Sequence, residues 1–262
     1  FILPFERLEP ANVGGTRAVV ELARRSGRAR LVHVSSVGVL PEGHPRGPAG
    51  LAEVAVGEGG RTLIPCGYTE TKRAAEALVS AAIREGLPGI IARPSVVAGS
   101  SRSGAWNLDD AMCRIIKGCI QAGAAPEIEW WPDLVPVDFV AEAIAALGER
   151  AKVDGSIFHV TSGAPVPFAR IVEVARRRGY HVDWLGYDAW LERLEGEGEG
   201  NALGPLTPWI RQARPFVDVR YDRSELTRAL AEGAVRCPAI DDALLERYFD
   251  AFVRAEFLAP PR

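Results

Sequence analysis

Hydrophobic residues in the first hundred positions follow two spacings that alternate along the chain. A helical spacing, with apolar residues every three or four positions, predicts helices over 11–26 and 69–85. An uncharged, β-branched run predicts a buried strand over 31–39, and a second apolar run predicts another over 89–98. The segment 41–67 is rich in Gly and Pro and predicts a long connection, a feature that in compact domains is usually functional. The order helix, strand, helix, strand is typical of a parallel α/β sheet with right-handed crossovers.

The pattern changes after residue 100, where helical spacing dominates and all six tryptophans lie. A β-branched run predicts a strand over 156–161, and the acidic segment 195–200 predicts a solvated loop. The predicted helices are 109–122, 137–147, 168–179 and 241–257.

Composition excludes several classes of protein. Of the 262 residues, 47% are hydrophobic and 25% are charged, which excludes a disordered chain. No apolar stretch approaches the roughly 18 residues of a membrane span, and no signal peptide opens the chain. The net charge of −3 gives no electrostatic reason to expect nucleic acid. The chain opens at Phe1 and its one methionine is Met112, so we expect a piece of a longer protein.

The cysteines and histidines form no pattern typical of metal binding. None of the four cysteines forms a CxxC pair, and the four histidines are scattered. We therefore predict no metal site and a set of reduced thiols in the cytoplasm.

The strongest chemical signal is the pair formed by Tyr68 and Lys72. Residues at i and i+4 of a helix share a face, so the phenol and the ammonium are expected to point the same way. A neighbouring cation favours the phenolate and lowers the pKa of a tyrosine from its usual value of about 10. Such a pair can exchange a proton with a substrate oxygen. The alternative is a surface tyrosine beside a surface lysine.

Two adjacent hydroxyls, Ser35 and Ser36, interrupt the first predicted strand. A hydroxyl in an apolar run must be hydrogen-bonded or face a cavity. A strand serine followed by a long connection and a YxxxK segment resembles the extended branch of the short-chain dehydrogenase/reductase superfamily. In that resemblance Ser36 aligns with the catalytic hydroxyl, and Ser35 is its nearest rival.

Further segments resemble, in order, the terminal thioester reductase (R) domain of nonribosomal peptide and polyketide synthetases. Near relatives are the reductase parts of α-aminoadipate reductase and carboxylic acid reductase. The segments are 11–16 (ANVGGT), 93–104 (RPSVVAGSSRSG), 107–110 (NLDD), 114–121 (RIIKGCIQ), 133–141 (DLVPVDFVA) and 255–261 (AEFLAPP).

The resemblance implies an α/β fold with a Rossmann-like parallel sheet and a smaller, mainly helical C-terminal substrate lobe. Residues 1–98 would be the remaining part of the NADP-binding domain. Residues 99–262 would form the lobe that faces substrate and carrier, with 134–162 returning to the first domain. The domain is expected to be monomeric.

The resemblance also implies a reaction: NADPH reduces an acyl or peptidyl thioester carried by a phosphopantetheinyl carrier protein. The product would be released as an aldehyde, which some family members reduce on to the alcohol. Ser36, Tyr68 and Lys72 would be the catalytic residues and would also contact the cofactor. Pro94 and Ser95 would lie along its nicotinamide half.

The sequence departs from the family in two respects. No GxxGxxG-type turn joins a strand to a helix, so we expect the phosphate-binding element to lie upstream of Phe1 and this piece alone to bind NADPH weakly. Ser36 stands where many R domains have threonine, and Ser95 where many have glycine. Asn12 is expected either to order the site or to cap a helix.

Three other functions stay open. The first is the reductase part of an α-aminoadipate or carboxylic acid reductase. The second is a carrier-docking fragment without catalysis. The third is a sugar-nucleotide epimerase or dehydratase of the same extended branch. The run Arg176-Arg177-Arg178 is either a carrier contact or a solvated helix face.

Overall fold

The computed structural model describes residues 3–57, 60–150 and 154–261. The chain divides into two compact units. Unit 1 consists of Phe1–Ser95, Asp138–Gly163 and Val219–Cys237, and unit 2 consists of Val96–Val137, Ala164–Asp218 and Pro238–Arg262. The segment Val219–Cys237 was not among those expected to return to the first unit. The assignment of the two units to cofactor and substrate lobes stays a proposal.

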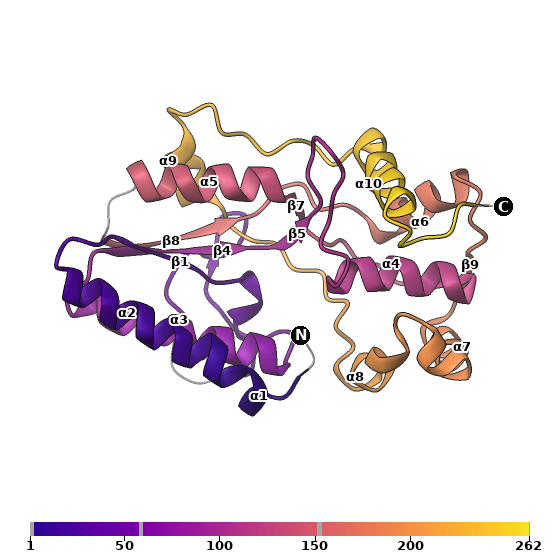
Figure 1. Ribbon diagram of the computed structural model, residues 1–262, viewed down its shortest axis with the longest axis horizontal. Coiled ribbons are helices and arrows are strands. Elements are labelled where there is room, and N and C mark those ends of the chain that lie inside the picture. The colour runs from indigo at the N-terminus through magenta and orange to yellow at the C-terminus, as the bar shows by residue number, and fades with distance from the viewer. Residues whose placement is uncertain (1–2, 58–59, 151–153, 262) are drawn as a thin grey trace. The chain divides into compact units, whose positions relative to one another are not determined.

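Unit 1 is built on a three-stranded parallel sheet. Its strands are β1 (Leu31–Val34), β4 (Gly89–Pro94) and β8 (Asp154–Val160), in the order β1-β4-β8. Figure 1 shows α2 (Gly15–Ser26) and α3 (Gly67–Arg84) on one face and α5 (Val137–Arg150) on the other. Helices on both faces bury the sheet, which explains why β1 and β4 read as uncharged runs in their first residues. The predicted Rossmann-like parallel fold is confirmed.

The first helix begins earlier than predicted. Instead of one helix over 11–26, α1 (Phe5–Glu9), a π-helical turn (Pro10–Gly14) and α2 follow one another without a break. Pro10 has no N–H and its ring clashes with the carbonyl four residues back, so the helix widens by one residue there. The helix ends as predicted at Gly27, whose φ of 63° is the left-handed conformation that glycine adopts readily.

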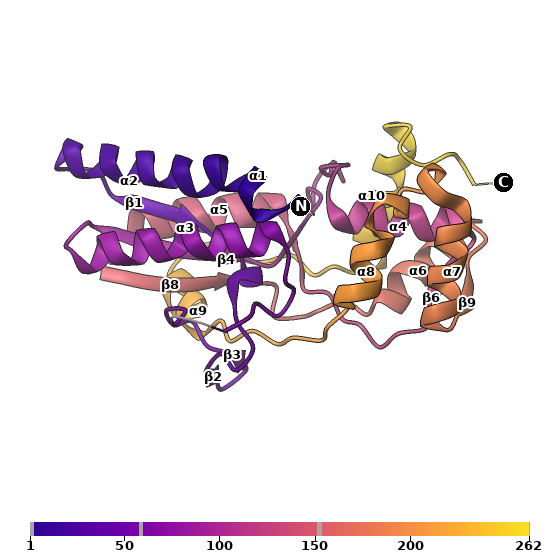
Figure 2. The same cartoon turned by 90° about the horizontal axis from the view of Figure 1, so that it is seen from below.

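The two strands predicted within the first hundred residues are both shorter than expected. β1 ends at Val34, and a 3-10 turn, η2 (Val37–Val39), follows because the Ser36 hydroxyl accepts a hydrogen bond from the Gly38 N–H. β4 ends at Pro94. The Ser95 N–H still donates to the Val160 carbonyl, but the next residue, Val96, begins β5 (Val96–Ala98), which belongs to unit 2. Between η2 and α3 lies a short hairpin of β2 (Arg46–Gly47) and β3 (Gly50–Leu51), labelled in Figure 2.

Unit 2 is mainly helical, as predicted for the second half of the chain. Its two small parallel pairs are β5 with β7 (Leu134–Pro136), and β6 (Ala124–Pro126) with β9 (Asp183–Leu185). The helices are α4 (Ala111–Ala122), α6 (Phe168–Arg177), α7 (Tyr187–Glu197), α8 (Thr207–Ala213) and α10 (Asp242–Arg254). α9 (Ser224–Leu230) belongs to unit 1, where it packs beside β8.

One predicted loop is wrong. The acidic segment 195–200 forms the end of α7 and a 3-10 turn, η3 (Gly198–Gly200). The cause is the buried Asn201, whose amide donates to Glu197 at 2.8 Å and to the Gly118 carbonyl at 2.9 Å. These two bonds fasten the end of α7 to α4. No helix within the described ranges is both long and apolar enough to cross a membrane.

Candidate active site

Tyr68 and Lys72 lie one turn apart at the start of α3, where both side chains are half-buried. The helix begins where it does because the Thr69 hydroxyl accepts from the Cys66 N–H at 3.2 Å and donates to the Ile64 carbonyl at 2.8 Å. The predicted i, i+4 pair therefore has the helical geometry that its chemistry requires.

Lys72 joins α3 to the carboxyl end of β1. Its Nζ donates to the Val34 carbonyl at 2.6 Å. An ammonium group has three N–H donors, of which Val34 takes one. Burial lowers the pKa of Lys72 from its ordinary value, and the negative charge of Glu76 acts in the opposite direction.

Ser36 lies two residues beyond Val34, in the turn that packs on the first turn of α3. Its Oγ accepts from the Gly38 N–H at 3.1 Å, and a Cβ on Gly38 would lie only 3.0 Å from the Thr69 methyl. Ser36 is half-buried, whereas its rival Ser35 is 4% exposed and its hydroxyl bonds to no described residue. Ser36 is therefore the more accessible hydroxyl at the end of β1.

Pro94 and Ser95 lie at the carboxyl end of β4, beside the end of β1. The Ser35 N–H donates to the Ala92 carbonyl at 2.7 Å, which pairs the two strand ends. The carboxyl ends of parallel strands are where ligands of open α/β sheets bind. The structure thus places all the predicted site residues in unit 1, at this edge of the sheet or on the first two turns of α3.

Asn12 contacts the same helix from the π-helical turn that precedes α2. It caps no helix; its amide donates to the Thr71 hydroxyl at 2.9 Å. Thr71 in turn donates to the Gly67 and Tyr68 carbonyls, at 2.8 and 3.0 Å. The π-helical turn that carries Asn12 is therefore fastened to α3 between Tyr68 and Lys72.

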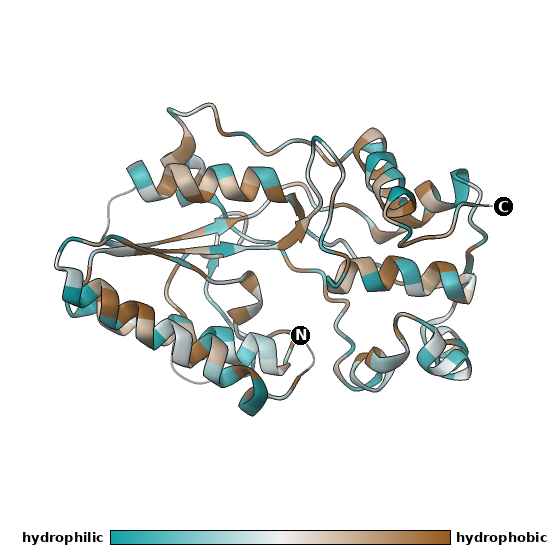
Figure 3. Ribbon diagram, viewed as in Figure 1, coloured by the Kyte–Doolittle hydropathy of each residue, from teal (hydrophilic) through white to brown (hydrophobic). Residues whose placement is uncertain are grey.

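Sequence reasoning missed a group of buried polar residues beneath α3, which we call the polar layer: His33, Glu76, Arg93 and His159. Arg93 is completely buried and forms a salt bridge with Glu76. Figure 3 shows hydrophilic teal close to the arrowheads of β4 and β8. An arginine inside the apolar run of β4, and a glutamate beside Ala75, were the available signals.

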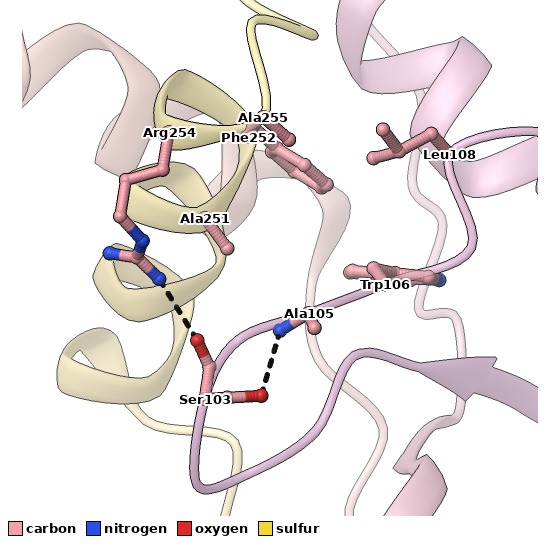
Figure 4. Close-up of a pocket in the computed structure, with 8 residues that line it drawn as sticks. All are labelled: Ser103, Ala105, Trp106, Leu108, Ala251, Phe252, Arg254 and Ala255. Atoms are coloured by element: carbon pink, nitrogen blue, oxygen red, sulfur yellow. Dashed lines mark hydrogen bonds between the residues drawn. The ribbon is translucent and has the colours of Figure 1, made fainter.

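A cavity of about 320 Å³ lies within unit 2 (Figure 4), and none of the predicted site residues lines it. One wall is the loop that follows β5. Helix α10 holds this loop: Tyr248 donates to the Gly99 carbonyl at 3.0 Å and Arg254 to the Ser103 carbonyl at 3.0 Å.

The residues at the sheet edge fit the nicotinamide and ribose half of a dinucleotide. Tyr68 and Ser36 supply hydroxyls, and Lys72 supplies an ammonium anchored by one of its three donors. A glycine-rich turn from a strand into a helix, which would bind the pyrophosphate, does not occur in the part of the chain that the structure describes. The described residues also contain no cluster of three or more His, Cys, Asp or Glu side chains that could hold a metal ion.

Comparison with known proteins gives consistent matches. The NAD-binding family described as male sterility protein matches residues 1–144. Glycine betaine reductase ATRR from Emericella nidulans is 34% identical over 272 residues, which cover 99% of this chain and 21% of that protein. The L-2-aminoadipate reductase large subunit from Eremothecium gossypii is 32% identical over 218 residues, 79% of this chain and 16% of that protein. The chain thus spans about a fifth or less of these relatives.

A solved structure matches the whole chain. The terminal R domain from the myxalamid PKS-NRPS biosynthetic pathway is 36% identical and superposes with a TM-score of 0.88, over 100% of this chain and 67% of that one. The segments quoted from the sequence and the parallel sheet agree with this match. The chain therefore belongs to the NAD-binding male sterility protein family and is of the terminal R-domain type.

Proposed function

We propose that the protein reduces an acyl or peptidyl thioester, held on the phosphopantetheine arm of a carrier protein, and releases it as an aldehyde. The cofactor would be NADPH, and the protein would act as the terminal domain of a nonribosomal peptide or polyketide synthetase in the cytoplasm. One observation carries the proposal: Ser36, Tyr68 and Lys72 lie at the carboxyl edge of a parallel sheet, in a chain whose whole length matches 67% of a terminal R domain.

Each site residue has a distinct part in this reaction. NADPH, when bound, supplies a hydride. Lys72 would hold the nicotinamide ribose through the donors that Val34 does not use, with Pro94 and Ser95 along the nicotinamide. Tyr68 and Ser36 would donate hydrogen bonds to the oxygen of the thioester carbonyl, on which negative charge develops.

The reduction proceeds through a hemithioacetal, which then breaks down to the aldehyde. The carbonyl carbon receives the hydride, and its oxygen takes the Tyr68 proton, which gives a hemithioacetal. The Lys72 ammonium stabilises the phenolate that Tyr68 becomes. The carbon–sulfur bond then breaks, the proton of the hemithioacetal hydroxyl passes to the departing sulfur, and an aldehyde and a free thiol remain. Solvent returns to Tyr68 the proton that it gave.

A second candidate is the reductase part of an α-aminoadipate or carboxylic acid reductase. The identity of 32% to an L-2-aminoadipate reductase large subunit favours it. The chemistry at the thioester is the same, so the two candidates differ only in the acyl group and the parent protein.

The partner would be a carrier protein, but Arg176, Arg177 and Arg178 are poor candidates for contacting it. Arg176 pairs with Glu173 at 2.8 Å and Arg177 with Asp242 at 2.7 Å, while Arg178 pairs with Asp250. Because each guanidinium already faces a carboxylate of this chain, the run favours the solvated-face interpretation.

The test uses the protein as its complete gene encodes it. A panel of acyl chains is loaded on the carrier, and NADPH consumption and trapped aldehyde or alcohol are measured, with NADH as the comparison cofactor. Tyr68→Phe is expected to lower turnover by roughly 10³-fold while NADPH still binds, since a positioned proton donor contributes roughly 10²–10⁴-fold.

The matched control is Tyr187→Phe, whose hydroxyl donates to the Ile210 carbonyl in unit 2 and should leave turnover unchanged. Full turnover by Tyr68→Phe would contradict the assignment. No turnover of any acyl thioester by the wild type would instead favour a carrier-docking fragment.

A further inference from the structure

The face of the sheet beneath α3 changes from apolar to charged within two residues. Side chains two positions apart on a strand point to the same face. The side chains nearer the start of the strands pack against α3 as an apolar cluster. Those further along the strands, together with Glu76, form the polar layer. The apolar cluster contains Leu31, Ile91 and Ile157 with Val79 and Ala82 of α3. In the polar layer Arg93 pairs in register with His159, whereas His33 pairs in register with Ile91.

All three nitrogens of the Arg93 guanidinium donate hydrogen bonds. Its Nε and Nη2 donate to the two carboxylate oxygens of Glu76, at 3.1 and 2.5 Å, and the two side chains are 0% and 3% exposed. Its Nη1 donates to the Val54 carbonyl at 3.0 Å and to His159 Nε2 at 3.2 Å. Such a two-pronged pair fixes both partners geometrically as well as electrostatically.

His159 cannot balance the charge of Arg93. Its Nδ1 lies 3.0 Å from the Asp222 carbonyl and must donate there, so Nε2 is an acceptor and the ring is neutral. Burial, with the charge of Arg93, lowers the pKa of His159 to about 3. The carboxylate of Glu76 is therefore the group that neutralises the buried guanidinium.

Glu76 also belongs to the stripe of α3 that carries the proposed chemistry. Tyr68, Lys72 and Glu76 lie at i, i+4 and i+8. The helix runs antiparallel to the strands. The distance along the helix from Val79 back to Lys72 is about 10 Å, and the distance along β4 from Ile91 to Pro94 is about the same. Lys72 is therefore level with the end of β4 when Val79 is level with Ile91. The salt bridge therefore lies one helical turn behind Lys72, between the apolar cluster and the edge of the sheet.

The surroundings of Lys72 oppose its positive charge unless Glu76 is ionised. His33 of β1 lies near Lys72 and Glu76, and its Nε2 is buried with no partner among the described residues. The Val34 carbonyl contributes a dipole, Tyr68 a neutral phenol and Glu76 a full negative charge. Removing the carboxylate would leave a half-buried ammonium and a buried guanidinium without their counter-charge.

We propose that Glu76, held by Arg93, is a positioning residue that keeps Lys72 charged and aimed at the carboxyl edge of the sheet. This rests on the proposed function, in which Lys72 binds the cofactor ribose and stabilises the Tyr68 phenolate. The pair has two effects: it fastens α3 to the strand that ends in Pro94, and it places a carboxylate one turn from the ammonium.

The test measures the titration of Lys72 directly. The rate at which acetic anhydride acetylates Lys72 is followed against pH by mass spectrometry of the peptide, with Lys117 of unit 2 as internal reference. In Glu76→Gln the midpoint for Lys72 is expected to fall by about one pH unit, because the opposing charge is gone. Lys117 should not move, and the control Glu70→Gln, an exposed glutamate of α3, should leave both midpoints in place.

A double variant separates positioning from folding. Replacing both members of a buried pair by apolar residues often preserves stability, so Glu76→Met with Arg93→Met should unfold near the wild-type temperature. The lowered midpoint of Lys72 should persist in it, because the carboxylate is still absent. A midpoint that returns to the wild-type value in the double variant, or that never moves in Glu76→Gln, would overturn the proposal.

Failure of this proposal can be told apart from failure of the proposed function. In the active protein the alkaline limb of kcat/KM should move with the Lys72 midpoint in both variants. An active wild type with an inactive Tyr68→Phe, but no movement of Lys72, would reject the role of Glu76 alone. A wild type without thioester reduction whose Lys72 still shifts would reject the proposed function and retain the role of Glu76.

Discussion

The two units of the molecule treat charge in opposite ways. Unit 1 buries the salt bridge between Arg93 and Glu76 beneath α3, with the two side chains almost inaccessible. The ion pairs described within unit 2 lie at its surface. They include Arg170 with Asp242, Arg211 with Glu195, and Arg214 with Asp188, whose side chains are 42–70% exposed.

The interior of unit 2 is filled by aromatic rings instead. Trp190 and Phe249 are fully buried, and the rings of Tyr248 and Phe252 contact Trp106. The buried hydroxyl of Tyr248 donates to the backbone carbonyl of Gly99. Burying two ions costs more free energy than burying apolar rings. Unit 1 is therefore less stable than an apolar interior would make it, at the place where the proposed chemistry lies.

Removing one charge from each unit should affect stability very differently. Glu76→Leu leaves Arg93 buried without a counter-charge, so we expect the free energy of unfolding to fall by about 3–5 kcal/mol. In unit 2, Glu195→Gln removes a surface pair and should cost less than about 1 kcal/mol. Urea unfolding of the two variants measures both values. Equal losses would show that the buried pair is no more important to stability than a surface pair.

The buried His33 makes the stability of unit 1 depend on pH. Burial, assisted by the charge of Lys72, lowers the pKa of His33 from 6.5 to about 4. Between these pH values the unfolded chain takes up a proton that the folded chain excludes, so stability falls as the pH decreases. The loss attributable to this residue is about 3 kcal/mol.

His33→Gln should therefore flatten the dependence of unfolding free energy on pH between 6.5 and 4. Denaturant midpoints at several pH values measure it. Glu53, whose pKa burial raises to about 7, contributes with the opposite sign, but it and His159 are present in both proteins and cancel in the difference. His181→Gln, at an exposed position of unit 2, is the control that should leave the slope as it is. Equal slopes in wild type and His33→Gln would mean that His33 titrates normally.

The sequence predicted regular elements where one side of each element is apolar. α3, α4, α6 and α10 and the strand β8 occur within a few residues of their predicted bounds because their buried faces follow the helical or strand period. Two of the errors occur where a polar side chain bonds the backbone. The Ser36 hydroxyl ends β1 early, and the Asn201 amide extends order into a segment expected to be a solvated loop.

The candidate site was predictable in part for a related reason. Tyr68 and Lys72 were found because i, i+4 spacing fixes their geometry locally. Glu76 and Arg93 were missed because their pairing joins a helix to a strand, and a single apolar-looking segment such as β4 does not show what its arginine meets. For Asn12 the sequence allows two roles, since only the fold brings its amide to Thr71.

The smallest expected effect concerns the two hydroxyls at the end of β1. Ser35 lies on the side of the buried polar layer, and Ser36 lies on the side of the proposed site. Ser36→Ala should lower turnover roughly 10- to 100-fold through the lost hydrogen bond to the developing oxyanion, with little change in stability. Ser35→Ala removes a buried hydroxyl that bonds to no described residue, so turnover should be unchanged and stability equal or slightly higher. Steady-state kinetics and urea unfolding of both variants decide the matter. The opposite result, a loss of turnover in Ser35→Ala only, would move the proposed oxyanion contact onto the buried face of β1 and extend the polar layer into the reaction itself.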